Sequence, residues 1–229
     1  MKICGLMKTT LLDFPGKVAC TVFLGDCNLR CTFCHNSDLA FYCEGDLLSE
    51  KDFFEFLSKR KGLLDGVCVT GGEPLMTDEV FDFIKKIKDL GLCVKLDTNG
   101  CFPQRLKKAL ESGNVDYVAM DIKNSLAEYP KTVGIDGFDV SVIEQSIDII
   151  KLSGIDHEFR TTVAKGLHTE ESVKELAKLI KDEKKYFLQC FKENEKVPDR
   201  ELKEFSNEEM NKLLRAAQTF VPDAALRGI

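Results

Sequence analysis

The sequence contains no long apolar run and no concentrated stretch of basic residues. No segment approaches the roughly 20 apolar residues that a membrane span requires, and the N-terminal residues lack the apolar run of a signal peptide. Lysine and arginine are spread along the chain and the net charge is −6, so there is no basic stripe to follow nucleic-acid phosphates. These absences predict a cytoplasmic protein that binds neither membrane nor nucleic acid.

Proline is scarce as well, and the composition is that of a globular protein rather than a disordered or fibrous one. Of the 229 residues, 44% are hydrophobic and 31% charged, with 6 prolines and 16 glycines. A chain of this length can bury a sizeable core, so we expect one domain over residues 1–229. The polar stretch 192–212 is interpreted as a connection and the solvated start of a helix, and we expect a helical extension over about 205–229.

Apolar, β-branched segments alternate with amphipathic helical patterns along most of the chain. The segments typical of buried strands are 17–24, 66–71, 93–98, 115–123, 157–163 and 185–191. Helical spacing of apolar residues lies between them, and Ser49 with Asp52 and Ser206 with Glu209 predict capping boxes. Such alternation gives a parallel sheet. Six units are too few for an eight-stranded closure, so the predicted fold is α/β, a partial open (β/α)6 barrel with its chemistry at the C-terminal strand ends.

The ten cysteines are unevenly distributed, and only three of them are closely spaced. In a reducing cytosol, cysteines favour metal binding or catalysis over disulfides. Seven are scattered singly and are interpreted as small buried hydrophobes: Cys4, Cys20, Cys43, Cys68, Cys93, Cys101 and Cys190. Cys27, Cys31 and Cys34 form CxxxCxxC in the loop 25–36, directly after the first predicted strand. Zinc is the alternative, but it usually takes four ligands, no second pair occurs, and His35 adjoins Cys34 too closely to serve easily.

Further polar residues follow the next strands. The sequence Gly71-Gly72-Glu73-Pro74 allows close backbone approach and a start for the following helix, although a tight turn alone would use the same residues. Asp97 ends the third predicted strand, and Asp121 and Lys123 end the fourth, where a helix cap or turn is the simpler interpretation. Arg160 lies within the fifth, where an interior charge requires a partner.

Four motifs together carry a resemblance to a known family. CNLRCTFC (27–34), TGGEP (70–74), LDTNG (96–100) and MDIK (120–123) resemble the radical S-adenosylmethionine enzymes, and more closely the activating enzymes of glycyl radical proteins. The resemblance covers residues 1–191. In its detailed sequence the chain is similar to the anaerobic ribonucleoside-triphosphate reductase activating proteins. The similar stretches are KTTLLDFPGKVACTVFLGDCNLRCTFCHN, DIKNS and HEFRTTV.

The resemblance implies a cofactor set and a reaction. Cys27, Cys31 and Cys34 would hold a four-iron four-sulfur (4Fe-4S) cluster whose fourth iron binds S-adenosylmethionine. The reduced cluster would split that molecule to a 5′-deoxyadenosyl radical, and this oxidoreductase would abstract a glycine α-hydrogen from a large glycyl radical enzyme, an anaerobic ribonucleotide reductase. A flavodoxin or ferredoxin would supply the electron. Because the loop has no further CxxC motif, we expect one cluster.

The resemblance also implies roles for individual residues. Asp121 and Lys123 would be catalytic, holding the cofactor and the substrate loop. A monovalent cation, Na⁺ or K⁺, would bind Asp97, Thr98 and Met120, since hard cations prefer oxygen ligands. Arg160 would meet the S-adenosylmethionine carboxylate, with an internal salt bridge as the alternative. The full set of residues implied to bind S-adenosylmethionine is Phe33, Gly71, Gly72, Glu73, Pro74, Asp97, Thr98, Asn99, Lys123, Arg160 and Gln189.

Three other functions are weighed against this one. An activating enzyme of the pyruvate formate-lyase type would share the chemistry and differ in its target. A 7-carboxy-7-deazaguanine synthase has a similar cysteine loop and TGGEP, but it usually continues CDT where this chain has CHN, and it lacks DIKNS and FRTTV. A non-enzymatic iron-sulfur electron carrier would have no reason to keep polar motifs at successive strand ends.

Overall fold

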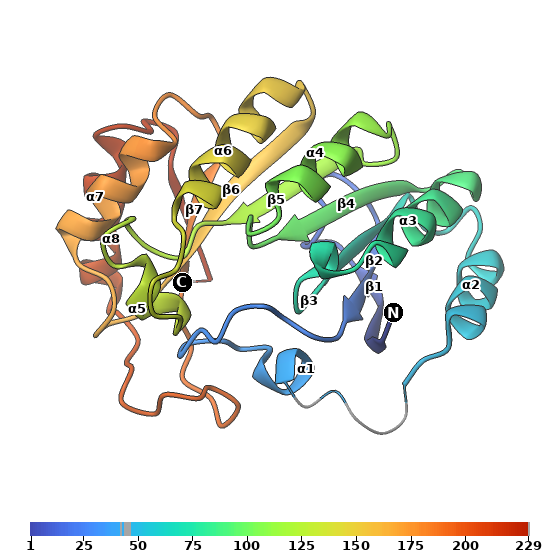
Figure 1. Ribbon diagram of the computed structural model, residues 1–229, viewed down its shortest axis with the longest axis horizontal. Coiled ribbons are helices and arrows are strands. Elements are labelled where there is room, and N and C mark those ends of the chain that lie inside the picture. The colour runs from blue at the N-terminus through green and yellow to red at the C-terminus, as the bar shows by residue number, and fades with distance from the viewer. Residues whose placement is uncertain (42, 44–46, 229) are drawn as a thin grey trace.

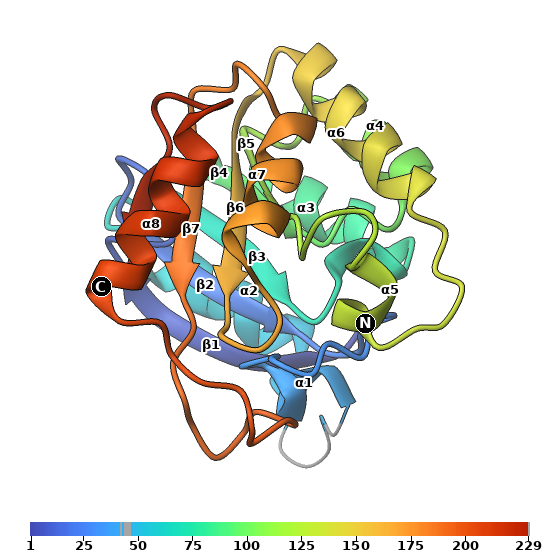
Figure 2. The same cartoon turned by 90° about the vertical axis from the view of Figure 1, so that its left-hand side faces the viewer.

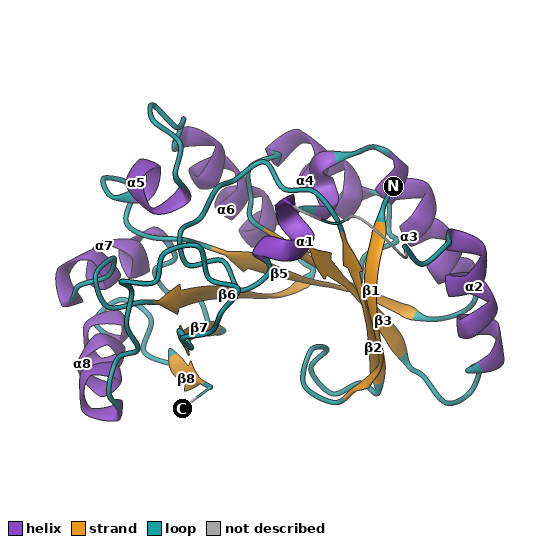
Figure 3. Cartoon of the chain, turned by 90° about the horizontal axis from the view of Figure 1, so that it is seen from below, coloured by secondary structure: helices purple, strands orange, loops and turns teal. Residues whose placement is uncertain are grey.

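The fold is built on one curved, eight-stranded sheet. The computed structural model describes residues 1–41, 43 and 47–228. Its strands follow one another in the sheet in the order of the chain, and only β1 and β2 are antiparallel. The strands are β1 (Ile3–Thr10), β2 (Ala19–Leu24), β3 (Gly66–Gly71), β4 (Cys93–Thr98), β5 (Tyr117–Asp121), β6 (Asp156–Val163), β7 (Tyr186–Cys190) and β8 (Ala225–Arg227). Figure 1 labels β1 to β7, and Figure 3 also labels β8.

Helices cover the convex outer face of this sheet (Figure 3). Alternate strand residues point to opposite faces, so Val94 and Leu96 of β4 join the buried apolar core while Lys95 and Asp97 lie on the inner face with other charged groups. The helices are α1 (Ser37–Phe41), α2 (Glu50–Lys59), the 3₁₀ turn η1 (Pro74–Met76), α3 (Glu79–Asp89), α4 (Pro103–Glu111), α5 (Tyr129–Val133), α6 (Ser141–Ser153), α7 (Glu170–Leu179) and α8 (Asn207–Gln218).

The sheet stays open, which confirms the predicted partial barrel. Its edge strands β1 and β8 are not paired with each other, and Figure 3 shows them on either side of the open part of the arc. The parallel strands β2 to β7 correspond to the six predicted segments. Their C-terminal ends point to the side of the molecule where α1 lies (Figure 2). In the described residues, no helix is long and apolar enough to span a membrane.

The two edge strands were not predicted. Three successive residues of β1, Met7 to Thr9, are exposed, so the strand lacks the alternation that identifies a half-buried strand. The prediction of a helical extension over 205–229 was wrong in its last part. The helix α8 ends at Gln218, and Ala225–Arg227 pairs with β7 as β8. Such a short strand has too few residues to show any periodicity.

The two predicted helix starts occur where expected. Ser206 and Glu209 form a reciprocal capping box in which each side chain accepts a hydrogen bond from the other's backbone amide. The Ser49 hydroxyl accepts a hydrogen bond from the Asp52 amide. The Asp52 carboxylate accepts one from the Ser49 hydroxyl at 2.6 Å, and not from the Ser49 backbone amide as in a reciprocal capping box. Both arrangements satisfy a free N–H group of the first helical turn.

Two of the scattered cysteines are joined in a disulfide, contrary to the prediction. Cys4 of β1 is bonded to Cys43, which follows α1, with their Cα atoms 6.0 Å apart. The bond closes a loop over a separation of 39 residues that contains β2 and the cysteine loop 25–36. Spacing along the chain could not reveal this pair, because the fold alone brings β1 beside the end of α1.

Reducing this disulfide is expected to lower the free energy of unfolding by about 3 kcal/mol, because a bond that closes a long loop restricts the unfolded chain. Urea unfolding of the metal-free protein with and without dithiothreitol measures the difference. The Cys4→Ser/Cys43→Ser double variant is the control, and its stability should not respond to dithiothreitol. Equal stability of the wild-type chain in both conditions would contradict the expectation.

Candidate active site

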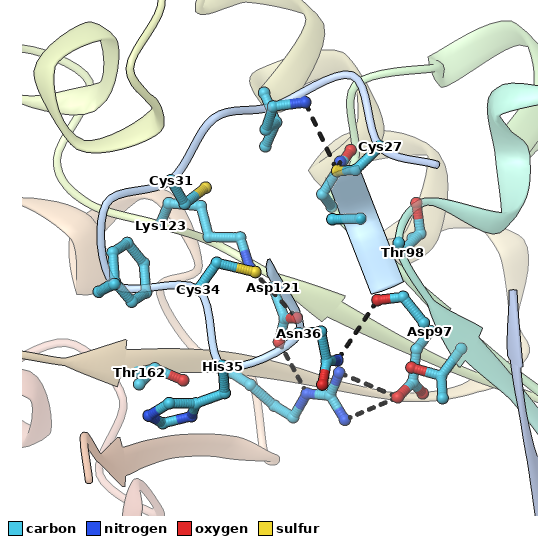
Figure 4. Close-up of a pocket in the computed structure, with 18 of the residues that line it drawn as sticks. Cys27, Cys31, Cys34, His35, Asn36, Asp97, Thr98, Asp121, Lys123 and Thr162 are labelled. Atoms are coloured by element: carbon cyan, nitrogen blue, oxygen red, sulfur yellow. Dashed lines mark hydrogen bonds and ion pairs between the residues drawn. The ribbon is translucent and has the colours of Figure 1, made fainter. Parts of the chain in front are cut away.

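The three closely spaced cysteines lie on the loop that connects β2 with α1, and all three line a pocket at the C-terminal strand ends (Figure 4). The backbone of this loop is fixed at several points. The Arg30 amide donates to the Val133 carbonyl at 2.9 Å, and the Cys34 amide donates to the Cys31 carbonyl at 3.2 Å. The loop thus presents three free thiols to one cavity of about 260 Å³.

Gly71 and Gly72 hold the end of β3 against the start of this loop. The Gly72 amide donates to the Leu24 carbonyl at 2.8 Å. A Cβ atom on Gly72 would lie 1.9 Å from the backbone oxygen of Asp26, and one on Gly71 would lie 2.2 Å from that of Leu24. Gly71 also has a φ of +120°, which side chains disfavour. Both glycines are therefore required by close contact with the chain itself, whatever they bind in addition.

Glu73 fixes the turn from within. Its carboxylate accepts hydrogen bonds from the Leu75 amide at 3.0 Å, the Thr98 hydroxyl at 2.9 Å and the Asn99 amide at 2.6 Å. Burial raises the pKa of Glu73 to about 7, although these three donors favour the ionised form. The side chain thus links the end of β3 to the end of β4.

Arg160 connects three strand ends by ion pairs. From β6 it donates through Nε to Asp121 of β5 at 2.8 Å, and through both terminal nitrogens to Asp97 of β4 at 3.1 Å. Asp97 and Asp121 both line the pocket (Figure 4). Burial alone would raise the pKa of both carboxyls, but Arg160 holds them below their usual range. The internal salt bridge considered from the sequence is therefore present.

Two buried charged residues that the sequence did not single out extend this network. Lys95 is 1% exposed and pairs with the other oxygen of Asp97. Glu158, also 1% exposed, receives both terminal nitrogens of Arg227 from β8 at 2.8 Å and lies 3.9 Å from Arg160. Lys95 lies between two apolar residues in the sequence, whereas Glu158 lies between His157 and Phe159. Only alternation within the strands could have suggested that they share the inner face.

Lys123 places a positive charge close to the cysteines. Its ammonium lies 3.3 Å from Asp121, and its positive charge acts on all three thiols. Burial raises the pKa of Cys31 to about 12, and Lys123 partly opposes this. The pKa of Cys27 and of Cys34 is likewise raised by burial. Deprotonated cysteines at this place therefore need further positive charge, such as iron supplies.

The structure brings most of the predicted residues to the same pocket. Glu73, Pro74 and Met120 do not line it: the first two form the buried turn, and Met120 lies in the apolar core. Three further polar residues on its wall, Asn36, Thr70 and Thr162, were not assigned a role from the sequence, and His35, which also lines it, was considered only as a zinc ligand. The predicted residues on its wall are Cys27, Cys31, Phe33, Cys34, Gly71, Gly72, Asp97, Thr98, Asn99, Asp121, Lys123, Arg160 and Gln189.

A segment far along the chain is fastened over the cysteine loop. Residues 192–204, here named the strap, were interpreted as a simple connection. The Asp199 amide donates to the Thr32 carbonyl at 3.0 Å, and His35 Nε2 lies 2.9 Å from the Lys192 carbonyl. Lys196 forms an ion pair with Asp38 at 3.3 Å. The strap is therefore fastened to the cysteine loop and to α1, and none of its residues lines the pocket.

Comparison with known proteins agrees with this geometry. Residues 21–180 match the family model described as the radical SAM superfamily, where SAM is S-adenosylmethionine. The chain belongs to the radical SAM superfamily. A Methanocaldococcus jannaschii protein, provisionally named a glycyl-radical enzyme activating enzyme, is 29% identical over 99% of this chain and 96% of its own length. The pyruvate formate-lyase-activating enzyme of Clostridium pasteurianum is 29% identical over 75% of this chain and 73% of its own.

Solved structures share the fold at low sequence identity. A domain of a pyruvate-formate lyase-activating enzyme from Bacteroides vulgatus has a TM-score of 0.59 and 16% identity, over 71% of this chain and 99% of that domain. Streptococcus suis SuiB bound to S-adenosylmethionine has a TM-score of 0.65 and 15% identity, over 91% of this chain and 52% of SuiB. By its superfamily match, the protein is a radical SAM enzyme, a family that implies a 4Fe-4S cluster and S-adenosylmethionine.

The residues present fit such a cluster better than a single metal ion. Among the described residues, no three His, Cys, Asp or Glu side chains converge closely enough to hold one ion. A cluster has its irons at separate corners, so it accepts three thiolates that surround a cavity without meeting at a point. Cys27, Cys31 and Cys34 surround the pocket in this way. Three cysteine ligands would leave one iron of such a cluster without a protein ligand, where S-adenosylmethionine could bind.

Proposed function

We propose that this radical SAM enzyme is an activating enzyme that abstracts an α-hydrogen from one glycine of a large partner and leaves a glycyl radical there. When bound, the reduced cluster supplies the electron that splits S-adenosylmethionine into methionine and a radical that takes the hydrogen. The proposal is carried by one observation: free cysteines and the ends of β4, β5 and β6 share a single pocket. The activating enzymes among the relatives support it.

Each part of the pocket has a separate task in this proposal. Cys27, Cys31 and Cys34 hold the cluster. Lys123 supplies a positive charge that is only partly neutralised by Asp121, so it can attract the carboxylate of S-adenosylmethionine. Phe33, 4% exposed, packs edge-on to His168 at 6.1 Å between ring centres and offers an apolar surface for the adenine.

Arg160, Asp97 and Asp121 act in this proposal mainly through one another. All three guanidinium nitrogens of Arg160 already donate to Asp97 or Asp121. The guanidinium therefore aligns the strand ends and meets the cofactor only at the pocket wall. The turn after β3 is formed by Gly71, Gly72, Glu73 and Pro74. Glu73 in turn holds Thr98 and Asn99 by hydrogen bonds. Gln189 lines the pocket from β7. Substrate contacts of Asp121 and Lys123 remain part of the proposal.

The cation predicted at Asp97, Thr98 and Met120 stays a prediction. Both carboxylate oxygens of Asp97 already contact positive groups, one the ammonium of Lys95 and the other the guanidinium of Arg160. A sodium or potassium ion would therefore have to share Asp97 with two protein cations. A carboxylate brought by S-adenosylmethionine would make that more favourable.

We propose the anaerobic ribonucleotide reductase as the partner, because the sequences of the cysteine loop, DIKNS and HEFRTTV resemble those of its activating proteins. Flavodoxin or ferredoxin as electron donor and a cytoplasmic location are proposed with it. A pyruvate formate-lyase as target is the second candidate, favoured by the activating enzymes of that type among the relatives. The electron-carrier interpretation has little support, because a carrier does not need polar strand ends around an open cavity.

Mixing the cluster-loaded enzyme anaerobically with S-adenosylmethionine, dithionite and the candidate reductase is expected to produce a glycyl doublet in electron paramagnetic resonance. The reductase with its radical-bearing glycine replaced by alanine is the control and should give no doublet. A doublet with pyruvate formate-lyase alone would keep the chemistry and change the target. No 5′-deoxyadenosine and no doublet with any glycyl radical enzyme would overturn the proposed function.

A further inference from the structure

The side chain of Asn99 lies between the end of β4 and the cysteine loop, and it is fixed on several sides. Asn99 is 6% exposed. Its Oδ1 accepts from the Cys101 amide at 2.9 Å, and its Nδ2 donates to Asn28 Oδ1 at 2.9 Å. Its own backbone amide donates to Glu73 at 2.6 Å. The side chain therefore has one defined orientation.

This orientation directs the amide nitrogen of Asn99 at a cluster ligand. A backbone amide can only donate, so the contact with Cys101 identifies the Asn99 atom facing it as the oxygen. The nitrogen must then face the other way, toward Asn28 and toward Cys27 Sγ, which lies 3.8 Å from Nδ2. The second N–H of the same group is thus available to the sulfur while the first bonds to Asn28.

Cys27 is distinguished from the other two cysteines by this contact. Its sulfur also faces the amide of Leu29 at 3.5 Å, so it has one backbone donor and one side-chain donor. The donors that act on Cys31 and Cys34 in the described part of the chain are backbone amides, those of Cys31 itself and Asn36. Only the donor from Asn99 can be removed by substitution without changing the loop backbone.

We propose that Asn99 donates an N–H···S hydrogen bond to the Cys27 ligand and thereby raises the reduction potential of the cluster. The proposal rests on the proposed function only in requiring the cluster at Cys27. A donor near a cluster sulfur stabilises the form that carries the additional electron, and hydrogen bonds to the sulfurs are among the factors that set cluster potentials. Asn99 is then a tuning residue that acts through Cys27 and makes the cluster easier for its electron donor to reduce.

The test is a redox titration of the cluster-loaded protein without S-adenosylmethionine or partner. Electron paramagnetic resonance monitors the reduced cluster at each potential. Asn99→Ala should lower the equilibrium constant for reduction about tenfold, which is ~59 mV for a one-electron couple. Asn99→Asp, which has the same shape but no N–H donor, should lower it at least as much. Asn99→Gln retains an amide and should recover part of the difference.

Asn28→Ala is the control for a merely structural role. It removes the other hydrogen-bond partner of Asn99 Nδ2 but leaves Asn99 Oδ1 bonded to the Cys101 amide. The equilibrium constant for reduction of the cluster should therefore change by less than about twofold. The proposal is wrong if Asn99→Asp binds the cluster with an unchanged potential, or if Asn28→Ala reproduces the shift. Because neither partner nor S-adenosylmethionine is present, failure to form a glycyl radical would leave this result untouched.

Discussion

Replacing Cys27, Cys31 or Cys34 with alanine should abolish both the cluster and the cleavage of S-adenosylmethionine. Each thiolate would bind a different iron, and the residues that line the cavity include no other cysteine that could replace one of them. Iron analysis after anaerobic reconstitution should give about four irons per wild-type chain. Chromatography of 5′-deoxyadenosine should then show product for the wild type and none for the three variants.

Cys190→Ala is the matched control for this loss. Cys190 is buried on β7, outside the pocket, where its thiol lies near the backbone oxygens of Phe191 and Phe205. The variant should keep both its iron and its product. Turnover that survives in Cys31→Ala would refute the ligand assignment, and about eight irons per chain would refute the expectation of a single cluster.

Arg160→Met should cost about 4 kcal/mol in the free energy of unfolding, because it leaves buried carboxylates without their partner. Asp97 would keep only Lys95, and Asp121 would keep only Lys123 at 3.3 Å. Burial would then raise the pKa of both carboxyls toward or above their ordinary values. Urea unfolding of the metal-free protein measures the loss, which includes no contribution from cofactor binding.

Lys203→Met makes the same kind of change in an exposed ion pair. Lys203 lies 2.8 Å from Glu193, and the two side chains are 57% and 47% exposed. Water screens such a pair, so its loss should cost under about 1 kcal/mol. If Arg160→Met were as mild as this control, the network at the strand ends would not be the buried, mutually dependent structure described above.

The local patterns of the sequence predicted the regular part of the fold. The segments 66–71 and 93–98 coincide with β3 and β4, because the first is a nearly continuous apolar run and the second alternates apolar with polar residues. The strand β1 has one exposed end and pairs antiparallel at an edge, so its sequence carries no such signal. The cysteine spacing was informative for a similar reason, since all three lie on one short loop.

The parts that the sequence could not show depend on residues brought together from distant elements. Glu158 meets Arg227 across 69 residues, and Cys4 meets Cys43 only because β1 returns beside α1. Asp97 was recognised as a strand-end carboxylate, but its partner Lys95 was not. One charge within a strand shows that a partner is needed, and only the register of neighbouring strands shows which one.

The strap has a consequence for exchanging parts between radical SAM enzymes. The superfamily match ends at residue 180, yet Asp199 and Lys196 beyond it hold Thr32 and Asp38 beside the cysteines. A chimera joined at residue 180 would combine the cysteine loop of one protein with the strap of another. The residues on both sides of that contact would have to be transferred together, as a single discontinuous unit.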